Sequence, residues 1–585
     1  MRIMKEVVTS TQMKAIDSYT IRKIGIPSVV LMERAALQVA NVVKQHSNPG
    51  DKILAVCGTG NNGGDGIAAA RILKCEGYEA AILLVGDENK ASAQTKEQLK
   101  IARNLSISIF NNININEYTI IIDGLFGIGL NRPVTGTYEE IIENINSGNH
   151  LVFAVDIPSG LSSDLAKPLN VAVKAHYTIT FGYNKVGLIL YPGCEYAGKV
   201  IVADIGFPQT AFDATSKTAG IHYHIYDNAD KEKLPTRHKY SNKGTYGKVL
   251  IIAGSNNMSG ACYLSAKAAY SSGAGLVKVM TVEENRIIMQ QLLPEALLYT
   301  YTSETLEDSS KIGEIIEQIH WATAIVIGPG IGVGLDSEKL LNLVIRNAKA
   351  PLLIDADGLN IIASMNHKKF VKDNELNKGN ELNKDDELNK DGELNKDYEL
   401  NKDGELNKDN ELNKDDELNR DNEPNKDNEL NKDYELNKDK TVFIHEDIVN
   451  MLPKGTILTP HIKELSRLIN MPVKEIVTNL LEISGKCTDN NELIFVIKDS
   501  RTIASYKEVA YINTSGNNGM STGGSGDVLT GIIGAFIGGG LSSWEAARLG
   551  VYIHGLAGDK AAEKKGCYSM MASDIIEALP EVLEK

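Results

Sequence analysis

Residues 52–66 read KILAVCGTGNNGGDG, an apolar stretch that runs directly into a glycine-rich turn. The apolar residues 52–57 predict a short buried strand, and the pattern of residues 66–76 predicts an amphipathic helix after the turn. A strand, a tight turn and a helix form the repeating unit of parallel sheets. The stretch therefore favours an α/β fold.

The same alternation continues along the chain in two series. Continuous apolar strands separated by helices such as 138–146 predict parallel sheets covered on both faces. We expect one domain at residues 1–212, a polar linker without clear periodicity at 213–242, and a second domain at 243–585. The first domain has further strands expected at 81–85, 119–122, 151–155, 177–181 and 199–203, and the second has strands expected at 248–253, 276–280, 324–327, 352–354, 456–458 and 493–497.

Residues 374–439 interrupt the second domain with eleven hexads of the form xELNKD, which depart from that form at Gly379, Arg420 and Pro424. Six residues turn a helix by about 240°, so its leucines would scatter to three sides. A strand would contain many Asn and Asp residues, which are poor strand formers. We predict a disordered, solvated insertion, with a partner-binding tether as the alternative.

Most of the net charge of −15 belongs to this insertion, which holds 23 acidic and 11 basic residues. The rest of the chain is close to neutral, so neither a nucleic-acid partner nor a membrane partner is expected. The six cysteines form no CxxC pair and predict buried thiols in a reducing compartment. We also find no apolar core of signal-peptide length at the N-terminus, and the apolar run 528–540 is too short to span a bilayer. A cytoplasmic enzyme is expected.

The glycine turn of the first domain contains GxGxxG at Gly58, Gly60 and Gly63. Glycines let the backbone approach a phosphate, and a helix N-terminus supplies unpaired N–H groups. The pattern alone is about as typical of a tight turn without a ligand. A hydride-transferring dehydrogenase is a third interpretation of the same glycines.

Two further loops follow expected strands and begin with aspartate, namely 123–130 (DGLFGIGL) and 156–160 (DIPSG). A single aspartate at a strand end is usually a helix cap. In open parallel sheets, however, ligands bind outside the carboxyl ends of the strands. Aspartates on two such loops, together with Asn61, Asn62 and Asp65, favour a site for a cation and a sugar.

At this point the first domain resembles a known family. The motifs TSTQMKAIDSYTIRKIGIPSVVLMERAA (9–36), NNGGDG, DGLFGIGL and VDIPSG resemble those of the NAD(P)H-hydrate epimerase domain, also called the YjeF N-terminal domain. The resemblance covers residues 5–212. It implies a Rossmann-like parallel-sheet domain that inverts C6 of the hydrated nicotinamide ring.

The resemblance also implies roles for individual residues. A potassium ion would be held near Asn62, Asp123 and Ser159, whose oxygens suit a hard cation. Asp123 is the candidate acid/base, because a carboxylate can move the proton as the C–O or C–N bond opens and recloses. The substrate-contacting residues would be Asn61, Asn62, Gly63, Gly64, Asp65, Gly127, Ile128, Gly129, Leu130, Asn131, Arg132, Pro133 and Asp156.

The second domain carries its strongest motif at 513–527, NTSGNNGMSTGGSGD, immediately before an apolar helix. The amides of Gly523–Gly526 would form an anion hole at the start of that helix, and Asp527 could accept a proton from a substrate hydroxyl. A flexible glycine loop with an Asp cap is the alternative. The turn 254–260, GSNNMSG, is not a P-loop, because no Gly-Lys-Ser/Thr follows it.

This GxGD arrangement resembles the ribokinase-like superfamily. The motifs at 250–279 (LIIAGSNNMSGACYLSAKAAYSSGAGLVKV), IGPGIG, IDADGLN and LTPHIKE narrow the resemblance to the ADP-dependent NAD(P)H-hydrate dehydratase domain, over residues 235–373 and 440–585. It implies a ribokinase-like α/β domain into which the low-complexity insertion is set. Contacts to the hydrate would come from Ala261, Gly330, His461 and Asp527, and contacts to the adenine nucleotide from Lys498, Asp499, Ser500, Arg501, Thr502 and Gly526.

The two resemblances together imply repair of hydrated NADH or NADPH, with ADP as co-substrate, Mg²⁺ as the nucleotide's counter-ion, and AMP and phosphate as products. Taken alone, His461 fits a core histidine and Lys498 a solvated lysine. A ribokinase-like small-molecule kinase with a non-catalytic nucleotide-binding first domain is the alternative function. A homo-oligomer is expected. The sequence leaves open the choice between NADH and NADPH, the purpose of the hexads and the bond that opens during epimerisation.

Overall fold

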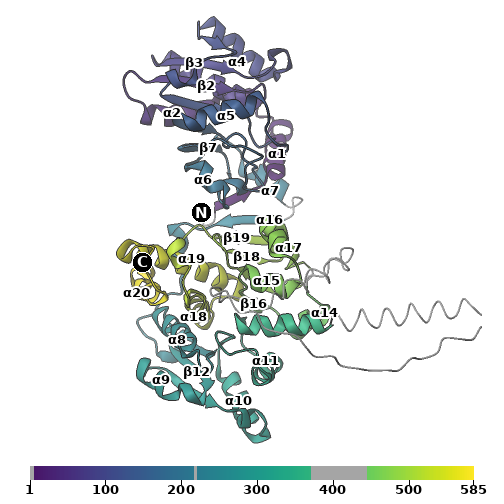
Figure 1. Ribbon diagram of the computed structural model, residues 1–585, viewed down its shortest axis with the longest axis vertical. Helices are drawn as coiled ribbons and strands as arrows, with labels where there is room; N and C mark the ends of the chain where they lie inside the picture. Colours follow the sequence, from purple (N-terminus) through teal and green to yellow (C-terminus); the bar gives the residue numbers. More distant parts are fainter. Residues whose placement is uncertain (1–4, 217–220, 370–443, 490, 585) are drawn as a thin grey trace, which may run out of the picture.

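The computed structural model describes residues 5–216, 221–369, 444–489 and 491–584. Within these residues the chain forms a seven-stranded sheet in its N-terminal half and a twelve-stranded sheet that is mostly C-terminal. Figure 1 shows the two lobes stacked along the long axis, with helices against both sheets. The predicted α/β class is confirmed. The predicted insertion at 374–439 lies outside the described residues.

All neighbouring strands of the seven-stranded sheet pair in parallel. Ile53 and Ala55 pack into one apolar layer, and Leu54 and Val56 pack into the layer on the opposite face. This burial of both faces explains why the strands are continuously apolar. In order across the sheet the strands are β4 (Ile109–Phe110), β3 (Glu79–Leu84), β2 (Lys52–Cys57), β5 (Ile120–Gly124), β6 (Leu151–Val155), β7 (Tyr177–Phe181) and β9 (Lys199–Ala203).

The strand order places a topological switch point between β2 and β5. The chain runs outward from β2 to β3 and β4, then returns to the other side of β2 as β5 and β6. Cys57 pairs with Gly124, and Asp123 pairs with Ala154, so the carboxyl ends of β2, β5 and β6 lie at one edge. A switch point of this kind opens a crevice for ligands at that edge.

The helix after β2 begins earlier than the sequence predicts. Helix α3 spans Asn61–Cys75, so the NNGGD residues form its first turns rather than the loop before it. Close packing explains the glycines, because a Cβ at Gly63 would lie 1.9 Å from the carbonyl oxygen of Gly58 and a Cβ at Gly66 would lie 2.8 Å from Cys57 Sγ. The other main helices of this lobe are α2 (Ser28–His46), α4 (Ala93–Asn104) and α5 (Thr137–Ser147).

The twelve-stranded sheet repeats this topology. Its chain runs from β11 to β12 and β13, then returns to the other side of β11 as β14 and β15. Two apolar layers again cover its faces. The C-terminal strands, in order across the sheet, are β13 (Leu297–Tyr301), β12 (Leu276–Val282), β11 (Lys248–Ile252), β14 (Ala324–Ile327), β15 (Leu352–Ile354), β16 (Ile457–Leu458), β17 (Ile494–Ile497), β18 (Ile503–Tyr506) and β19 (Val509–Ile512).

Helices pack on both faces of this sheet. The apolar layer of Val249 and Ile251 also includes residues of α8, α18, α19 and α20, whereas the layer of Leu250 and Ile252 includes residues of α10, α11 and α15. These helices are α8 (Ser259–Ser271), α10 (Ser309–Trp321), α11 (Leu335–Asn347), α15 (Ile462–Ile469), α18 (Ser525–Gly538), α19 (Ser543–Lys565) and α20 (Ala572–Leu583).

Three strands extend the C-terminal sheet into the N-terminal lobe. Beyond β19 the sheet continues through β10 (His222–Ile225), β1 (Lys5–Val8) and β8 (Asn184–Lys185). The segment 213–242 therefore contributes a strand to a shared sheet, although its polar composition predicts a linker. Because β10 pairs with both β1 and β19, backbone hydrogen bonds connect the two lobes.

An apolar cluster covers this junction. Val7 and Val186 come from the first lobe, whereas Ile503, Ala510 and Ile512 come from β18 and β19.

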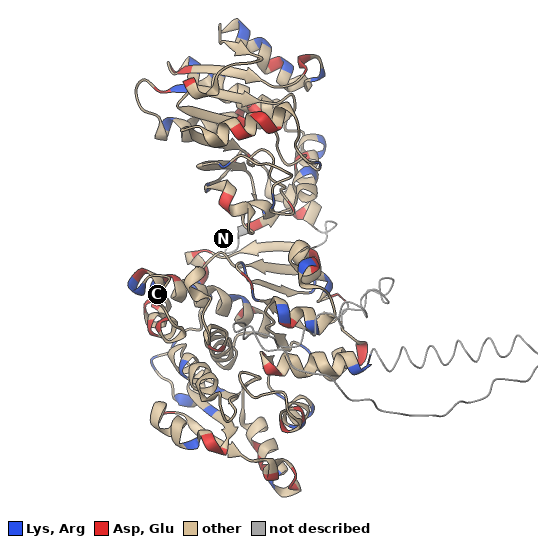
Figure 2. Cartoon of the chain, in the orientation of Figure 1, with Lys and Arg blue, Asp and Glu red and all other residues tan. Residues whose placement is uncertain are grey.

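No described helix is long and apolar enough to cross a membrane. Figure 2 shows acidic and basic residues distributed along the ribbons of both lobes.

We expect Ile503→Ala to lower the free energy of unfolding by about 2–5 kcal/mol, because it leaves a cavity where a fully buried side chain packs. Urea unfolding of the full chain, followed by circular dichroism, measures this change. Ile287→Ala is the control, since Ile287 is 67% exposed and a surface change is worth about 0.5 kcal/mol or less. Equal effects of the two substitutions would contradict the assignment of Ile503 to the junction core.

Candidate functional sites

The first candidate site lies at the carboxyl edge of the seven-stranded sheet, at the start of α3. Gly60 precedes the helix, and no side chain caps its first turn. The N–H groups of this turn are therefore available to an anionic ligand, and the helix dipole favours negative charge there. Asn61 is exposed and Asn62 is half-buried, whereas Gly63 and Gly64 are buried in the packing.

Asp123, Ser159 and Asn62 meet around the loop that follows β5. Ser159 donates its hydroxyl to Asp123 Oδ1 at 2.6 Å and its backbone N–H to Asp123 Oδ2 at 2.8 Å. Asn62 Nδ2 donates to the carbonyl oxygen of Phe126 at 2.9 Å, and the N–H of Phe126 donates to Ser159 Oγ at 2.8 Å. Asp123 is fully buried, and this burial raises its pKa to about 6 against the opposing hydrogen bonds from Ser159 and Leu125.

This cluster suits a hard monovalent cation. A carboxylate, a hydroxyl, a side-chain amide and the Phe126 carbonyl all offer oxygen atoms within one hydrogen-bonded group. The described residues contain no group of three or more His, Cys, Asp or Glu side chains that could hold a metal ion. The oxygen donors of this cluster are of the kind expected for the potassium site that the family resemblance implies.

Asp156 directly follows β6, the strand next to β5, and forms an ion pair with the buried Lys185. Lys185 was not among the residues predicted from the sequence. Lys185 Nζ donates to Asp156 Oδ1 at 2.6 Å, and Thr180 Oγ1 donates to the same oxygen at 3.1 Å. Burial lowers the pKa of Lys185, and Asp156 opposes that shift. A lysine within the apolar stretch FGYNKVGLIL (181–190) was the available sequence signal.

Acidic side chains surround the start of α3. Burial raises the pKa of Asp65 well above its usual value, and the charges of Asp156 and Asp17 raise it further. Burial also raises the pKa of Asp17, which comes from α1 (Ser10–Tyr19). Asp65 therefore interacts electrostatically with both Asp156 and Asp17.

The other residues expected to contact the substrate lie in the loop after β5. Gly127 lies against Asn62, and Ile128 and Leu130 are half-buried. The exposed residues of this loop are Gly129, Asn131, Arg132 and Pro133.

The second candidate site lies at the start of α18. Gly524 has a positive φ of 87°, and no side chain caps the helix, so its first amides can meet an anion. Asp527 is half-buried in the first turn, and its backbone carbonyl accepts from the hydroxyls of Ser265 and Thr530. Burial raises the pKa of Asp527 to about 7; Asp355 raises it too, whereas Lys498 lowers it.

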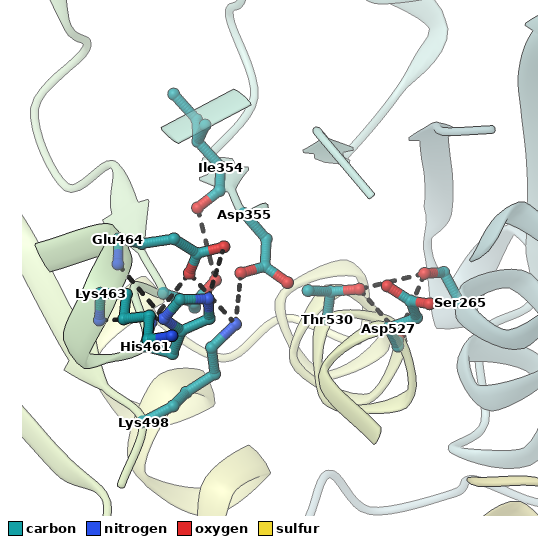
Figure 3. Close-up of polar contacts among 10 residues, drawn as sticks. Ser265, Ile354, Asp355, His461, Lys463, Glu464, Lys498, Asp527 and Thr530 are labelled. Carbon is teal, nitrogen blue, oxygen red and sulfur yellow. Dashed lines mark hydrogen bonds and ion pairs between the residues drawn. The ribbon is translucent and has the colours of Figure 1, made fainter. Parts of the chain in front are cut away.

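A charged group faces this helix start (Figure 3). Lys498 Nζ donates to Asp355 Oδ1 at 2.6 Å and lies 4.0 Å from Glu464 Oε2. A Cβ at Gly526 would lie 3.4 Å from Lys498 Nζ, so the ammonium faces the proposed anion hole. Burial lowers the pKa of Lys498, but Asp355 and Glu464 outweigh it and raise the pKa overall. Asp355 lies in the IDADGLN motif, but neither Asp355 nor Glu464 was predicted from the sequence to contact a ligand.

His461 caps α15 and turns one ring nitrogen toward the backbone. Its Nδ1 accepts from the N–H groups of Lys463 and Glu464 at 3.1 and 3.2 Å. Burial and the charge of Lys498 lower the pKa of His461, which favours a neutral ring. Its side chain is half-exposed, and Nε2 lies 3.5 Å from Glu464 Oε1.

Ala261 and Gly330 pack against each other near the start of α18. A Cβ at Gly330 would lie 3.0 Å from Ala261 Cβ, and Gly330 has a positive φ of 63°. Ala261 is one turn from Leu264, which packs against Gly524. The absence of a side chain at Gly330 thus allows close packing against Ala261 and Met258.

Residues 498–502 lie in two different environments. Lys498 faces α18, and Asp499 and Ser500 are exposed. Arg501 turns to the junction, where it donates to the carbonyls of Ile189 and Thr514 at 3.2 and 2.8 Å and lies over the Tyr191 ring. The sequence could not place Arg501 against the first lobe, because that contact joins distant parts of the chain.

A buried histidine also supports the helix start and was missed. His554 Nε2 lies 3.4 Å from Ser525 Oγ, and burial lowers the pKa of His554 to about 4. The ring is therefore neutral at physiological pH. Its position inside the continuously apolar side of α19 resembles that of an ordinary core residue, so the sequence pattern gave no signal.

Comparison with known proteins identifies both lobes. The family described as YjeF-related protein N-terminus matches residues 28–187, and the family described as NAD(P)H-hydrate dehydratase matches residues 249–376 and 439–581. The bifunctional NAD(P)H-hydrate repair enzyme of Thermofilum pendens is 30% identical over 595 residues, which cover 99% of this chain and 96% of that protein.

Two further relatives each match one part of the chain. The NAD(P)H-hydrate epimerase of Limosilactobacillus fermentum is 45% identical over 201 residues, which cover 34% of this chain and 97% of that protein. The structure of ADP/ATP-dependent NAD(P)H-hydrate dehydratase from Bacillus subtilis, co-crystallised with ATP/Mg²⁺, is 20% identical, covers 61% of this chain and 96% of its own, and has a TM-score of 0.42.

We expect Asp355→Asn to lower the pKa of Asp527 from about 7, because it removes a negative charge while Lys498 stays. An NMR titration with ¹³C-labelled aspartate measures the shift, and the Asp527→Asn spectrum identifies the signal. Asp357→Asn is the control, since Asp357 raises this pKa less than Asp355 does. An unchanged pKa in Asp355→Asn would show that Asp355 does not set the charge of Asp527.

Proposed function

The chain belongs to the family of bifunctional NAD(P)H-hydrate repair enzymes, and we propose that it returns both epimers of hydrated NADH or NADPH to the intact coenzyme. The relationship extends over nearly the whole chain, not over one lobe. The observation that carries the proposal is the pair of uncapped helix starts, each beside a carboxyl group whose pKa is raised toward neutrality. Each lobe thus has its own site for proton transfer beside an anionic ligand.

In the N-terminal lobe we assign epimerisation at C6 of the hydrated ring. The phosphates of the nucleotide would meet the amides at the start of α3, beside Asn61–Asp65, and residues 127–133 would cover the other side. Asp156 would accept a hydrogen bond from a substrate hydroxyl. Asp123 is the proposed acid/base, and its pKa of about 6 allows it to give and take a proton near neutral pH.

The oxygen cluster around Asp123 would hold potassium. Asn62, Asp123 and Ser159 supply side-chain oxygens that fit this ion. When bound, potassium would supply a fixed positive charge beside the substrate. The residues themselves orient the loop after β5, because Ser159 bonds both Asp123 and the backbone of Phe126.

In the C-terminal lobe we assign ADP-dependent dehydration. Asp527 would take the proton of the C6 hydroxyl as that oxygen bonds to the β-phosphorus of ADP, and the bond from this phosphorus to AMP breaks. The amides of Gly523–Gly526 and the Lys498 ammonium would stabilise the transferring phosphoryl group. Loss of the proton from C5 and of phosphate from C6 then restores the C5–C6 double bond.

The substrates would lie on either side of the start of α18. Ala261, Gly330 and His461 would contact the hydrate, and Lys498–Thr502 and Gly526 would contact the adenine nucleotide. Mg²⁺ would neutralise the nucleotide phosphates when bound, and nucleotide phosphates commonly supply part of its coordination. A ribokinase-like kinase would share this geometry, but relatives along the whole chain favour repair over that alternative.

We assign residues 1–212 to the epimerase domain and residues 243–585 to the dehydratase domain, with residues 213–242 between them. We propose that the enzyme works in the cytoplasm as a homo-oligomer on small-molecule substrates.

We expect Asp123→Asn to reduce epimerisation of purified R hydrate by about 10²-fold or more, because the amide cannot carry the proton. The rate is measured without ADP, by chromatographic separation of the epimers. ADP-dependent dehydration of the S epimer by the same variant reports that the chain is folded. A variant that dehydrates S and epimerises R normally would remove Asp123 from the proposed mechanism.

We expect the reciprocal result for Asp527→Asn. Dehydration of the S epimer with ADP falls by about 10²-fold or more, whereas epimerisation is unchanged. The recovery of NADH absorbance measures the first reaction, and the epimer separation measures the second. Normal dehydration by this variant would refute the phosphorylation step.

A further inference from the structure

Lys185 is a fully buried lysine for which the proposed reaction gives no role. Its Nζ donates to Asp156 Oδ1 at 2.6 Å, to Thr180 Oγ1 at 2.8 Å and to the carbonyl oxygen of Phe181 at 3.0 Å. An ammonium has three protons, so these three acceptors satisfy it completely. Lysines are almost never buried without such partners. The position and the hydrogen bonds of this ammonium are therefore fixed by the fold.

The partner carboxylate is fixed on one side only. Asp156 Oδ1 accepts from Lys185 Nζ, from Thr180 Oγ1 at 3.1 Å and from the backbone N–H of Phe181 at 3.2 Å. Asp156 Oδ2 has no hydrogen-bond partner among the described residues. The three donors therefore hold one oxygen in the protein and leave the other available to a ligand.

The backbone at Asp156 adds to this constraint. Its φ of +65° is left-handed, a conformation that costs a residue with a side chain about 1 kcal/mol or more. Asp156 N–H donates to the carbonyl oxygen of Ile179 at 2.8 Å, which holds the strained residue against β7. Strain of this kind persists where the surrounding structure fixes it, and it is common at ligand-binding positions.

The available oxygen lies in the first candidate site. The register of β2, β5 and β6 puts Asp156, which directly follows β6, at the sheet edge where α3 begins, and its charge raises the pKa of Asp65 in that helix. Asp156 also occupies the strand end next to β5 and its oxygen cluster. A hydroxyl donor bound at the start of α3 would therefore lie at the same edge of the sheet as Asp156.

We propose that Lys185 is a positioning residue of the epimerase site, which holds Asp156 so that Oδ2 accepts a hydrogen bond from a hydroxyl of the hydrated nucleotide. The inference rests on the proposed function, from which the substrate is taken. Lys185 acts through Asp156 and does not itself touch the substrate. Its loss therefore weakens substrate binding more than it slows the chemical step.

The competing role for Lys185 is purely structural. Lys185 belongs to β8, which pairs with β1 in the shared sheet, whereas Asp156, Thr180 and Phe181 belong to the ends of β6 and β7. The ammonium thus also ties the two sheets together. A structural tie would affect folding and all kinetic constants, but it would not act specifically through Asp156.

The test compares Lys185→Met, Asp156→Asn and the double variant in the full chain. Epimerisation of the R hydrate without ADP gives kcat and KM for each. We expect Lys185→Met to raise KM about tenfold or more with a much smaller change in kcat, as for loss of a hydrogen bond to a charged group. We expect the double variant to have the KM of Asp156→Asn alone, because Lys185 acts through that carboxylate.

Lys52→Met is the matched control. Lys52 also pairs with a carboxylate, at 3.9 Å from Glu79, but its side chain is 49% exposed. We expect it to change neither constant. An increase in KM as large as that of Lys185→Met would show that the effect is not specific to the buried pair.

Other outcomes overturn the inference. One is a fall in kcat for Lys185→Met with KM unchanged; another is a double variant whose KM is the product of the two single effects. If Lys185→Met does not fold, the double variant replaces it in the test, because the double variant buries neither charge. A KM of the double variant equal to that of Asp156→Asn supports the inference. A KM higher than that of Asp156→Asn overturns it. An unchanged KM in Asp156→Asn refutes this inference but leaves the proposed function standing. A wild-type chain that does not epimerise the hydrate refutes the proposed function itself.

Discussion

Parallel pairing in aligned register is the constraint on which both sites depend. In each lobe the chain adds strands on one side of its first central strand and then returns to the other side, which opens a crevice at the carboxyl ends. The register of β2, β5 and β6 brings Asp123 and the loop after β6 to the start of α3. The register of β11, β14 and β15 brings Gly330 and Asp355 to the start of α18 in the same way.

Each lobe then uses a buried lysine–aspartate pair beside its uncapped helix. In the first lobe Lys185 holds Asp156, and in the second Lys498 holds Asp355, both with an N–O distance of 2.6 Å. The two pairs serve different ends. The first leaves one carboxylate oxygen of Asp156 without a hydrogen bond from the described residues, whereas the second presents its ammonium to Gly526, where a phosphoryl group would bind. Buried charges need such partners, because an unpaired charge in the interior is costly.

The sequence predicted most of the central strands but little of the junction. Strands β2, β6, β7, β9, β14 and β15 have the predicted bounds, because their continuous apolar runs can be read without knowing their neighbours. Strand β8 has two residues and no period, and β10 lies in a polar segment that becomes a strand only beside β1 and β19. Strand-end aspartates and glycine-rich turns predicted the positions of both candidate sites. Lys185 and His554 could not be assigned from sequence, because their partners come from other elements.

The most direct measurement follows NADH absorbance after the purified chain is mixed with both epimers of NADH hydrate, with and without ADP. The account predicts full recovery of NADH from both epimers, and only when ADP is present. Recovery from one epimer alone would leave the dehydratase but contradict the epimerase assignment of the first lobe. No recovery would contradict the repair function, and accumulation of a phosphorylated alcohol product would then favour the kinase.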